Sequence, residues 1–428
     1  MALDIIDLTA ILIRTSISTW IKPYLASRWE KSLSDQYLVL LFTLLALMLF
    51  VSYLLHFGLD KFRIPHLLAP LLVGFILQLL PLSSLTNVAT GEAFSVLAQF
   101  GIMFLLFLVG FQLNAKLLRS LSVEIALLAI LNLAFSSILG LCVLVSFGYP
   151  PFISVLVSTA LATVAEATIA PILDELGVIK TKIANLIVGP GIFDDVAEVM
   201  IASLASVMVG ADQAAANPIF LMIGFLAFVA FALVFHRFII PLIARFDRAP
   251  KDTHLFLLIV CTALIFTAIS QNFRLGVLLG AIVAGLASQR FQNSSNADSK
   301  AFTTLRAVTY GFLGPVFFFG IGLSVNISSF VDSFQLTLWL LAANFFGKFL
   351  AALIVGKMIK LNLKAIATIG LGLSAKFSMG IIPVQIFYAA KIIDQQLFSA
   401  FVGVSAITTM IVPFTLAYVI NRWTSSVC

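Results

Sequence analysis

Charged side chains are scarce in this sequence: Asp, Glu, Lys and Arg make up only 10% of its 428 residues, against about 25% in a typical soluble protein. Hydrophobic residues make up 61%, and the mean hydropathy is +1.13. A soluble chain of this length needs a polar surface that this composition does not supply. Disorder is excluded as well, because disordered chains are poor in aromatic residues and this one has 40 Phe. The composition therefore indicates a protein embedded in a membrane.

Metal-binding and redox residues are also few. The three cysteines form no CxxC motif, and the four histidines are scattered without the spacing of metal ligands. We therefore expect no disulfide framework, no bound metal and no cofactor. The connections between apolar stretches are too short for a soluble catalytic or nucleotide-binding domain, so we expect a protein that is not an enzyme. The net charge of +6 is interpreted through membrane topology rather than as nucleic-acid binding.

Long apolar stretches dominate the chain from residue 36 onwards. A helix that crosses the hydrocarbon core needs about 20 apolar residues, and about 13 stretches approach or meet this length. They cover residues 36–58, 63–80, 93–113, 123–147, 151–173, 183–210, 217–243, 254–271, 274–289, 303–328, 334–356, 365–390 and 396–420. Residues 1–35 are less apolar and are predicted to hold an amphipathic segment on the membrane surface. The predicted fold class is an all-α polytopic membrane protein.

The basic residues between the stretches predict an orientation. With the C-terminus in the cytoplasm and the spans alternating backwards from it, 17 of the 25 Lys and Arg residues fall in cytoplasmic loops. Only six fall outside, and four of these belong to the N-terminal segment. This bias follows the positive-inside rule. It predicts a multi-pass protein of the cell inner (plasma) membrane with a cytoplasmic C-terminus.

Six charged residues lie within predicted spans, where no loop or interface accounts for them. A charge near the bilayer centre costs at least about 2.5 kcal/mol on insertion scales, so such residues are functional candidates. They are Glu166, Asp194, Asp195, Glu198, Lys348 and Lys376.

The adjacent carboxylates of Asp194 and Asp195 follow a Gly-Pro-Gly turn in the sixth span. Neighbouring residues on a helix point about 100° apart, so one can face a cavity while the other meets a neighbouring helix. Two such groups favour proton exchange near neutral pH, and their oxygens suit a hard cation such as Na⁺. Helix capping is the structural alternative. Glu198, one turn after Asp194, either lines the ion path or orients the pair.

Lys348 lies in the middle of the eleventh span, too far from either interface for its ammonium to reach water. It needs an acidic partner, and the aspartate pair is the obvious one. A buried lysine also loses its proton more easily than an exposed one. A purely structural ion pair is the alternative.

The fifth and twelfth spans resemble interrupted helices. The fifth has clustered Thr and Ala, with Thr163, Glu166 and Pro171; the twelfth has glycines, serines, Lys376 and Pro383. Each is fourth in a set of five spans, and the sets are offset by an odd number of spans, so they run in opposite directions. Two inverted five-helix repeats are predicted, with broken helices that bind ions in the core.

Several motifs together resemble the monovalent cation:proton antiporter-2 family. They are FGIMFLLFLVGFQLN at 100–114, LDELG ending at residue 177, FDD at 193–195, LLGAIVAGL at 278–286, GPVFFFGIGLSVNI at 314–327 and TTMIVPF at 408–414. The match runs from about residue 36 to residue 421, which is nearly the whole chain.

The resemblance implies a 13-helix sodium/proton antiporter fold in which a core domain moves like an elevator against a dimerisation domain. Residues 36–421 would form the membrane domain. The core would come from about 123–210 and 334–421, the dimerisation domain from about 36–113 and 254–328, and a linker helix from 217–243. A homodimer in a lipid membrane is implied, with no nucleic-acid partner.

The resemblance also implies residue roles. Asp195 matches the essential aspartate that binds the cation and the proton, and Asp194 matches the variable position before it, which is Asp in electrogenic sodium exchangers. Lys348 matches the lysine that pairs with the first aspartate. Where Kef-type relatives carry a glutamate in the twelfth span, this sequence has Lys376-Phe377-Ser378. We hypothesise that Glu166 and Lys376 pair where the broken helices cross. Alternatively, Glu166 is itself a cation ligand.

The function expected from these residues is electrogenic exchange of Na⁺ (or Li⁺) for protons by alternating access. Kef-type K⁺/H⁺ antiport is the alternative within the same class. An intramembrane aspartyl protease is a remote alternative, because the sequence contains no Tyr-Asp pair and no other span offers an aspartate.

Overall fold

The computed structural model describes residues 36–61, 64–80, 83–113, 115–191, 193–194, 218–240, 242, 252–294, 300–325, 333–376 and 381–427. Within these ranges the chain is helical and contains no strand. The predicted all-α fold class is confirmed. The predicted amphipathic segment 1–35 lies outside the described residues.

Each predicted span has a helical counterpart, although the sixth is described only over its first part. The first is the helix Gln36–Asp60. The others are α2 (Leu68–Leu79), α4 (Glu92–Gln112), α6 (Ser122–Ser146), α7 (Pro151–Ala162) with α8 (Glu166–Glu175), α9 (Lys182–Val188), α11 (Pro218–Val234) with η2 (Phe235–Ile239), α13 (Asp252–Asn272), α14 (Gly276–Ser294), α15 (Lys300–Val308) with η3 (Thr309–Leu313) and α16 (Gly314–Ser324), α18 (Phe334–Met358), α19 (Leu363–Leu373) with α20 (Ile381–Ala389), and α21 (Gln395–Val427). Two short helices, α3 (Ser83–Ala89) and α5 (Ala115–Ser120), lie in connections.

The outer surface is apolar. Nine of the described helices are long and apolar enough to cross a membrane, and large side chains such as Phe42, Phe346 and Leu363 are more than 60% exposed. In water such a surface would drive aggregation, whereas in a bilayer it faces lipid tails. Polar groups such as Asn132, Asn344 and Lys348 are instead fully buried. Apolar side chains thus lie on the outside and these polar groups lie inside, the reverse of a water-soluble protein. This arrangement suits a fold that is surrounded by lipid.

Both helices that the sequence predicted to be interrupted are broken. The fifth span leaves helical geometry at residues 163–165, between α7 and α8, and the twelfth leaves it after α19. The prolines do not mark the breaks. Pro171 lies inside α8 and Pro383 inside α20, each after the start of its second half-helix.

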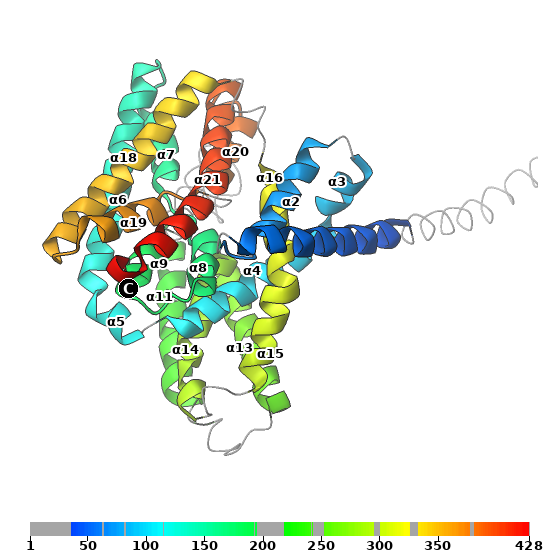
Figure 1. The fold of residues 1–428 in the computed structure, drawn as a ribbon. Helices are drawn as coiled ribbons and strands as arrows, with labels where there is room; N and C mark the ends of the chain where they lie inside the picture. Colours follow the sequence, from blue (N-terminus) through cyan, green and yellow to red (C-terminus); the bar gives the residue numbers. More distant parts are fainter. Residues whose placement is uncertain are drawn as a thin grey trace, which may run out of the picture.

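The helices around the two breaks correspond to one another at a constant offset. Adding 212 to the residue numbers of α6 gives those of α18, and the same shift brings the start of α7 to the start of α19. In Figure 1, α6 leads from α5 to α7 and α18 leads back towards α19, so α6 and α18 run in opposite directions. The position equivalent to Lys348 is Ser136.

A second group of helices packs closely through small residues. The Cβ of any side chain at Gly110 would lie 2.2 Å from the carbonyl oxygen of Ile282, and one at Gly285 would lie 2.2 Å from that of Phe107. These reciprocal contacts hold α4 and α14 at backbone distance, as small residues do in membrane helix pairs. Figure 1 shows α13, α14 and α15 gathered away from α6, α7, α18 and α19.

Candidate functional site: the crossing of the interrupted helices

The two breaks meet in the middle of the molecule. The backbone N–H of Ala165, between α7 and α8, donates to the carbonyl oxygen of Ala375, after α19, at 3.0 Å. The hydroxyl of Thr409 on α21 donates to the carbonyl oxygen of Lys376. The extended segments therefore bond to each other and to the last helix. The C-terminal ends of α7 and α19 and the N-terminal end of α8 lie near this point, where helix-terminal backbone groups lack partners within their own helices.

Lys348 neutralises the C-terminal ends of both first halves. Its Nζ donates to the carbonyl oxygen of Thr163 at 2.9 Å and to that of Leu373 at 2.6 Å. The side chain is fully buried on α18. A helix C-terminus carries partial negative charge, so one ammonium offsets two of them. Its predicted pairing with an aspartate stays a prediction.

Lys376 adds a second cation at the same place. Its Nζ donates to the carbonyl oxygens of Ala160 at 2.9 Å and Thr163 at 3.3 Å, and it lies 5.4 Å from the centre of the Phe401 ring. Thr163 thus accepts from both lysines through its backbone, while its own hydroxyl donates to Ala160. Both buried lysines therefore act on the C-terminal end of α7.

Two asparagines, which the sequence analysis did not single out, donate from α6 and α18 to backbone carbonyl oxygens at the two breaks. Asn132 on α6 donates through Nδ2 to the carbonyl oxygen of Ala162 at 3.1 Å, and Asn344 on α18 donates to that of Ser374 at 3.2 Å. In both cases the acceptor follows the asparagine by 30 positions. The signal in the sequence that could have pointed to either residue is a single amide side chain within an otherwise apolar span.

Asp194 lies against the first break. It is 2% exposed, and the backbone of Val164 hydrogen-bonds to its carboxylate. Its Oδ2 is buried and has no hydrogen-bond partner among the residues that the structure describes. A buried carboxylate oxygen with no donor leaves a strong acceptor position open. A cation or a proton fits that position.

Glu166 begins α8 and is 1% exposed. Its carboxylate lies against Gly191, where a Cβ would come within 2.7 Å of Oε2. The side chain therefore faces the turn that leads to Asp194, and its negative charge is favourable in the first turn of a helix. The hypothesis that it pairs with Lys376 and the alternative that it binds the cation both stay predictions.

Of the residues singled out from the sequence, the structure places Thr163, Glu166, Asp194, Lys348 and Lys376 around this crossing. Asp195 and Glu198 lie outside the described residues. The site combines fixed cations at helix C-termini with carboxylates near helix N-termini, all away from bulk water. Its buried oxygens offer acceptor positions that fit a small cation or a proton.

The asparagine contacts give a direct test of how the crossing is held. Replacing Asn344 with leucine leaves the Ser374 carbonyl buried without this donor, which costs about 1–3 kcal/mol. We expect a lower apparent melting temperature in detergent. Asn132→Leu should give a similar loss, because it removes the corresponding bond. Thr415→Val, which removes a hydroxyl bonded within its own helix, is the control. Melting temperatures unchanged in both asparagine variants would contradict this role.

Known proteins resemble the chain over most of its length. The family model described as "Sodium/hydrogen exchanger, transmembrane" matches residues 45–422. An Na⁺/H⁺ antiporter of Enterococcus hirae is 23% identical over 360 residues, covering 84% of this chain and 92% of that protein. The Na⁺/H⁺-K⁺ antiporter GerN of Bacillus cereus is 24% identical over 362 residues, covering 83% and 89%.

A solved structure shares the fold. The sodium proton antiporter MjNhaP1 from Methanocaldococcus jannaschii superposes with a TM-score of 0.65 at 16% sequence identity, covering 90% of this chain and 95% of that one. At this identity the likeness concerns the arrangement of helices, and it confirms the antiporter fold expected from the sequence.

Proposed function

Because the chain belongs to the sodium/hydrogen exchanger family, we propose that it is a secondary transporter that exchanges Na⁺ for protons across a membrane. The observation that carries the proposal is the buried Oδ2 of Asp194, which has no donor among the described residues and lies beside the broken helices. It supports Asp194, with Asp195, as the group that binds either a cation or a proton.

The charges at the crossing suggest how exchange is coupled. Lys348 and Lys376 offset the C-terminal ends of α7 and α19, so the site has fixed positive charge before an ion arrives. Carboxylates without a cation or proton are costly to move through an apolar barrier. In our proposal the site therefore crosses only when Na⁺ or protons neutralise it, which prevents leakage. Two aspartates with one cation support electrogenic exchange.

K⁺/H⁺ antiport is the alternative, and the name of GerN, which includes both ions, keeps it open. Backbone and carboxylate oxygens such as those at the crossing suit hard cations in general, so the ion must be identified by transport. An enzymatic reaction such as intramembrane proteolysis is not supported, because the family consists of transporters.

We infer an elevator-like movement of a core domain (about 123–210 and 334–421) against a dimerisation domain (about 36–113 and 254–328), with 217–243 as linker and two inverted repeats. The opposite directions of α6 and α18 support the repeats. A homodimer in the plasma membrane with its C-terminus in the cytoplasm completes the proposal, supported by the basic loops.

Transport by the purified protein in liposomes tests the proposal. With an internal pH dye and a clamped membrane potential, adding Na⁺ or Li⁺ outside is expected to drive protons out, and K⁺ is expected to do so weakly or not at all. Equal rates with K⁺ would favour the Kef-type alternative. No cation-dependent proton movement with any of the three ions would overturn antiport.

A further inference from the structure

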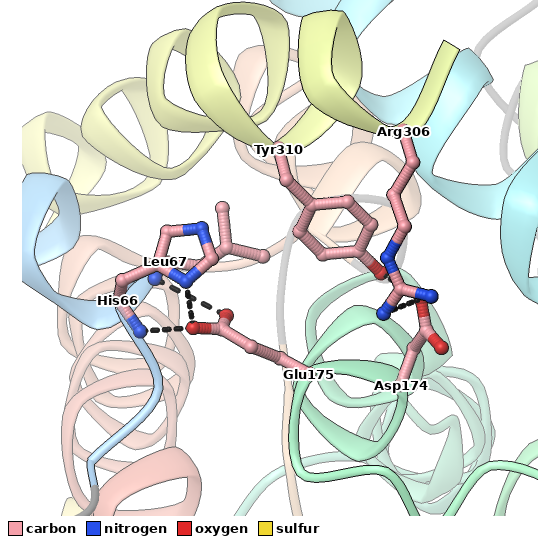
Figure 2. Close-up of polar contacts among 6 residues, drawn as sticks. All are labelled: His66, Leu67, Asp174, Glu175, Arg306 and Tyr310. Carbon is pink, nitrogen blue, oxygen red and sulfur yellow. Dashed lines mark hydrogen bonds and ion pairs between the residues drawn. The ribbon is translucent and has the colours of Figure 1, made fainter. Parts of the chain in front are cut away.

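A second polar cluster lies at the other end of α8, away from the crossing. Figure 2 shows two consecutive acidic residues, Asp174 and Glu175, reaching towards residues of different helices. The side chain of Asp174 is 1% exposed and that of Glu175 is 12% exposed. The proposed transport site does not use either residue. Their burial therefore calls for a separate explanation.

Glu175 binds the start of α2. Its carboxylate accepts from the backbone N–H of His66 and pairs with the His66 ring, and it accepts from the backbone N–H of Leu67 at 3.3 Å. The N-terminus of α2 has no side-chain cap of its own. A carboxylate from another helix therefore supplies the negative charge that a helix N-terminus favours.

Asp174 binds three further groups through one oxygen. Its Oδ2 accepts from the Tyr310 hydroxyl and from Gln112 Nε2 at 2.8 Å, and it lies 3.6 Å from Arg306 Nη2. Arg306 also stacks over the Tyr310 ring at 5.4 Å. These partners come from the end of α4, from α15 and from η3. Charge-assisted contacts of this kind are stronger than neutral hydrogen bonds.

The partners of Asp174 and Glu175 all come from one of the two proposed domains. The start of α2, the end of α4, α15 and η3 fall within residues 36–113 and 254–328, the proposed dimerisation domain. The end of α8 falls within residues 123–210, the proposed core domain. The contacts are therefore placed where the two domains must slide past each other.

We propose that Asp174 and Glu175 form a latch that holds the core domain against the dimerisation domain in the conformation of this structure, and that protonation of His66 strengthens the latch. This inference rests on the proposed antiport function and adds its regulation. Asp174 and Glu175 are positioning residues, since they act on the movement of the site rather than on the ion.

The groups around His66 set the direction of the pH effect. Glu175 of α8, Tyr310 of η3, Arg306 of α15 and His56 of the first helix face it, with the His56 ring centre 5.8 Å away. Burial lowers the pKa of His66, and the hydrogen bond and charge of Glu175 raise it by more, so that the pKa is above its ordinary value of 6.5. The imidazolium is favoured only while the latch is closed.

The latch is expected to weaken as the pH rises. A histidine whose pKa is higher in the closed state stabilises that state in acid, and the stabilisation is lost as the pH rises through the raised pKa. The latch is therefore tight at acidic pH and loosens towards alkaline pH. Protonation of His66 therefore shifts the closed-to-open ratio towards the closed state. We expect the maximal exchange rate to be several-fold lower at acidic than at alkaline pH.

The test compares maximal rates at saturating cation, because protons that compete with Na⁺ at Asp194 change the apparent affinity rather than this rate. In proteoliposomes containing the full chain, the wild type should have a several-fold higher maximal rate at pH about 8.5 than at about 6, and His66→Gln and Glu175→Gln should bring this ratio near one. The amide of Glu175→Gln keeps an oxygen for the backbone of α2 but loses the charge.

Tyr149→Phe is the matched control. It removes a hydroxyl that donates to the carboxylate of Asp394 at 3.1 Å, and both residues lie within the proposed core domain. The ratio of its maximal rates at the two pH values should equal that of the wild type. Wild-type exchange with unchanged ratios in both latch variants would overturn the latch and leave antiport intact. No cation-dependent proton movement by the wild type would instead overturn the antiport function.

Cross-linking gives a second, pH-independent readout. In a variant with its native cysteines replaced by serine, His66→Cys and Glu175→Cys are joined by a short bis-thiosulfonate reagent. We expect exchange to stop on cross-linking and to return on reduction, while either single cysteine shows no loss. Undiminished exchange by the cross-linked protein would show that this contact never opens during transport, and would overturn the proposal.

Discussion

Replacement of Lys348 with methionine is expected to abolish exchange and to destabilise the protein. The ammonium is fully buried and donates to carbonyl oxygens at the ends of α7 and α19. Methionine fills much of the volume but leaves the Leu373 carbonyl without this donor, at about 1–3 kcal/mol, while the Thr163 carbonyl keeps its bond from Lys376. A loss of about 3 kcal/mol from the state in which the ion crosses corresponds to a rate decrease of about 100-fold.

The measurement pairs transport in proteoliposomes with thermal unfolding in detergent. Lys364→Met is the control, because it makes the same chemical change at an exposed position, where the ammonium lies 5.9 Å from the centre of the Trp423 ring. The control should keep wild-type rates and melting temperature. A Lys348→Met protein with wild-type exchange would show that the helix ends do not need this cation.

Replacement of Asp195 with asparagine is expected to reduce exchange to the level of vesicles without the protein. An amide neither releases a proton nor balances the charge of a bound cation, so both halves of the cycle lose their carrier group. Asp194→Asn is expected to keep some exchange but to move less net charge per ion. Dequenching of a pH dye in everted vesicles measures the first effect, and the dependence of the rate on a clamped potential measures the second.

Asp394→Asn is the matched control for both aspartate variants. Asp394 is exposed between α20 and α21, and its Oδ1 accepts from the backbone N–H of Leu397 at 2.8 Å. Asparagine caps a helix about as well as aspartate, so this variant should transport normally. Persistent exchange by Asp195→Asn would assign the carrier role to another carboxylate, with Asp194 and its buried Oδ2 the first candidate.

The membrane architecture was predictable because burial in lipid leaves a strong signal. Apolar stretches located the spans, and charged residues within them pointed to Asp194, Lys348 and Lys376, which the structure brings to the crossing. The break in the fifth span was also predicted, although Pro171 lies well inside α8 and does not cause it. The Thr and Ala cluster before Glu166 was the better indicator.

The remaining contacts could not be predicted because they depend on partners distant in sequence. Asn132 is neutral and so does not appear in a search for charges, and its role requires knowing that a carbonyl is freed 30 positions later. Asp174 and Glu175 follow the predicted fifth span, so they were not among the charged residues that the sequence singled out within spans. Their burial follows from the approach of α2, α4 and α15, which hydropathy does not reveal.

Lys348 on α18 and Ser136 on α6 occupy corresponding positions but differ in charge, and this difference affects the kinetics of transport in the two directions. The helices α6 and α18 match at a constant offset, yet α18 carries the charged Lys348 at the position where α6 carries Ser136. No symmetry therefore relates the two faces of the transporter, and the concentration of Na⁺ for half-maximal rate is expected to differ between them. Without a driving gradient, the ratio of maximal rate to this concentration must be equal in both directions. The face with the weaker affinity must then support the faster maximal rate.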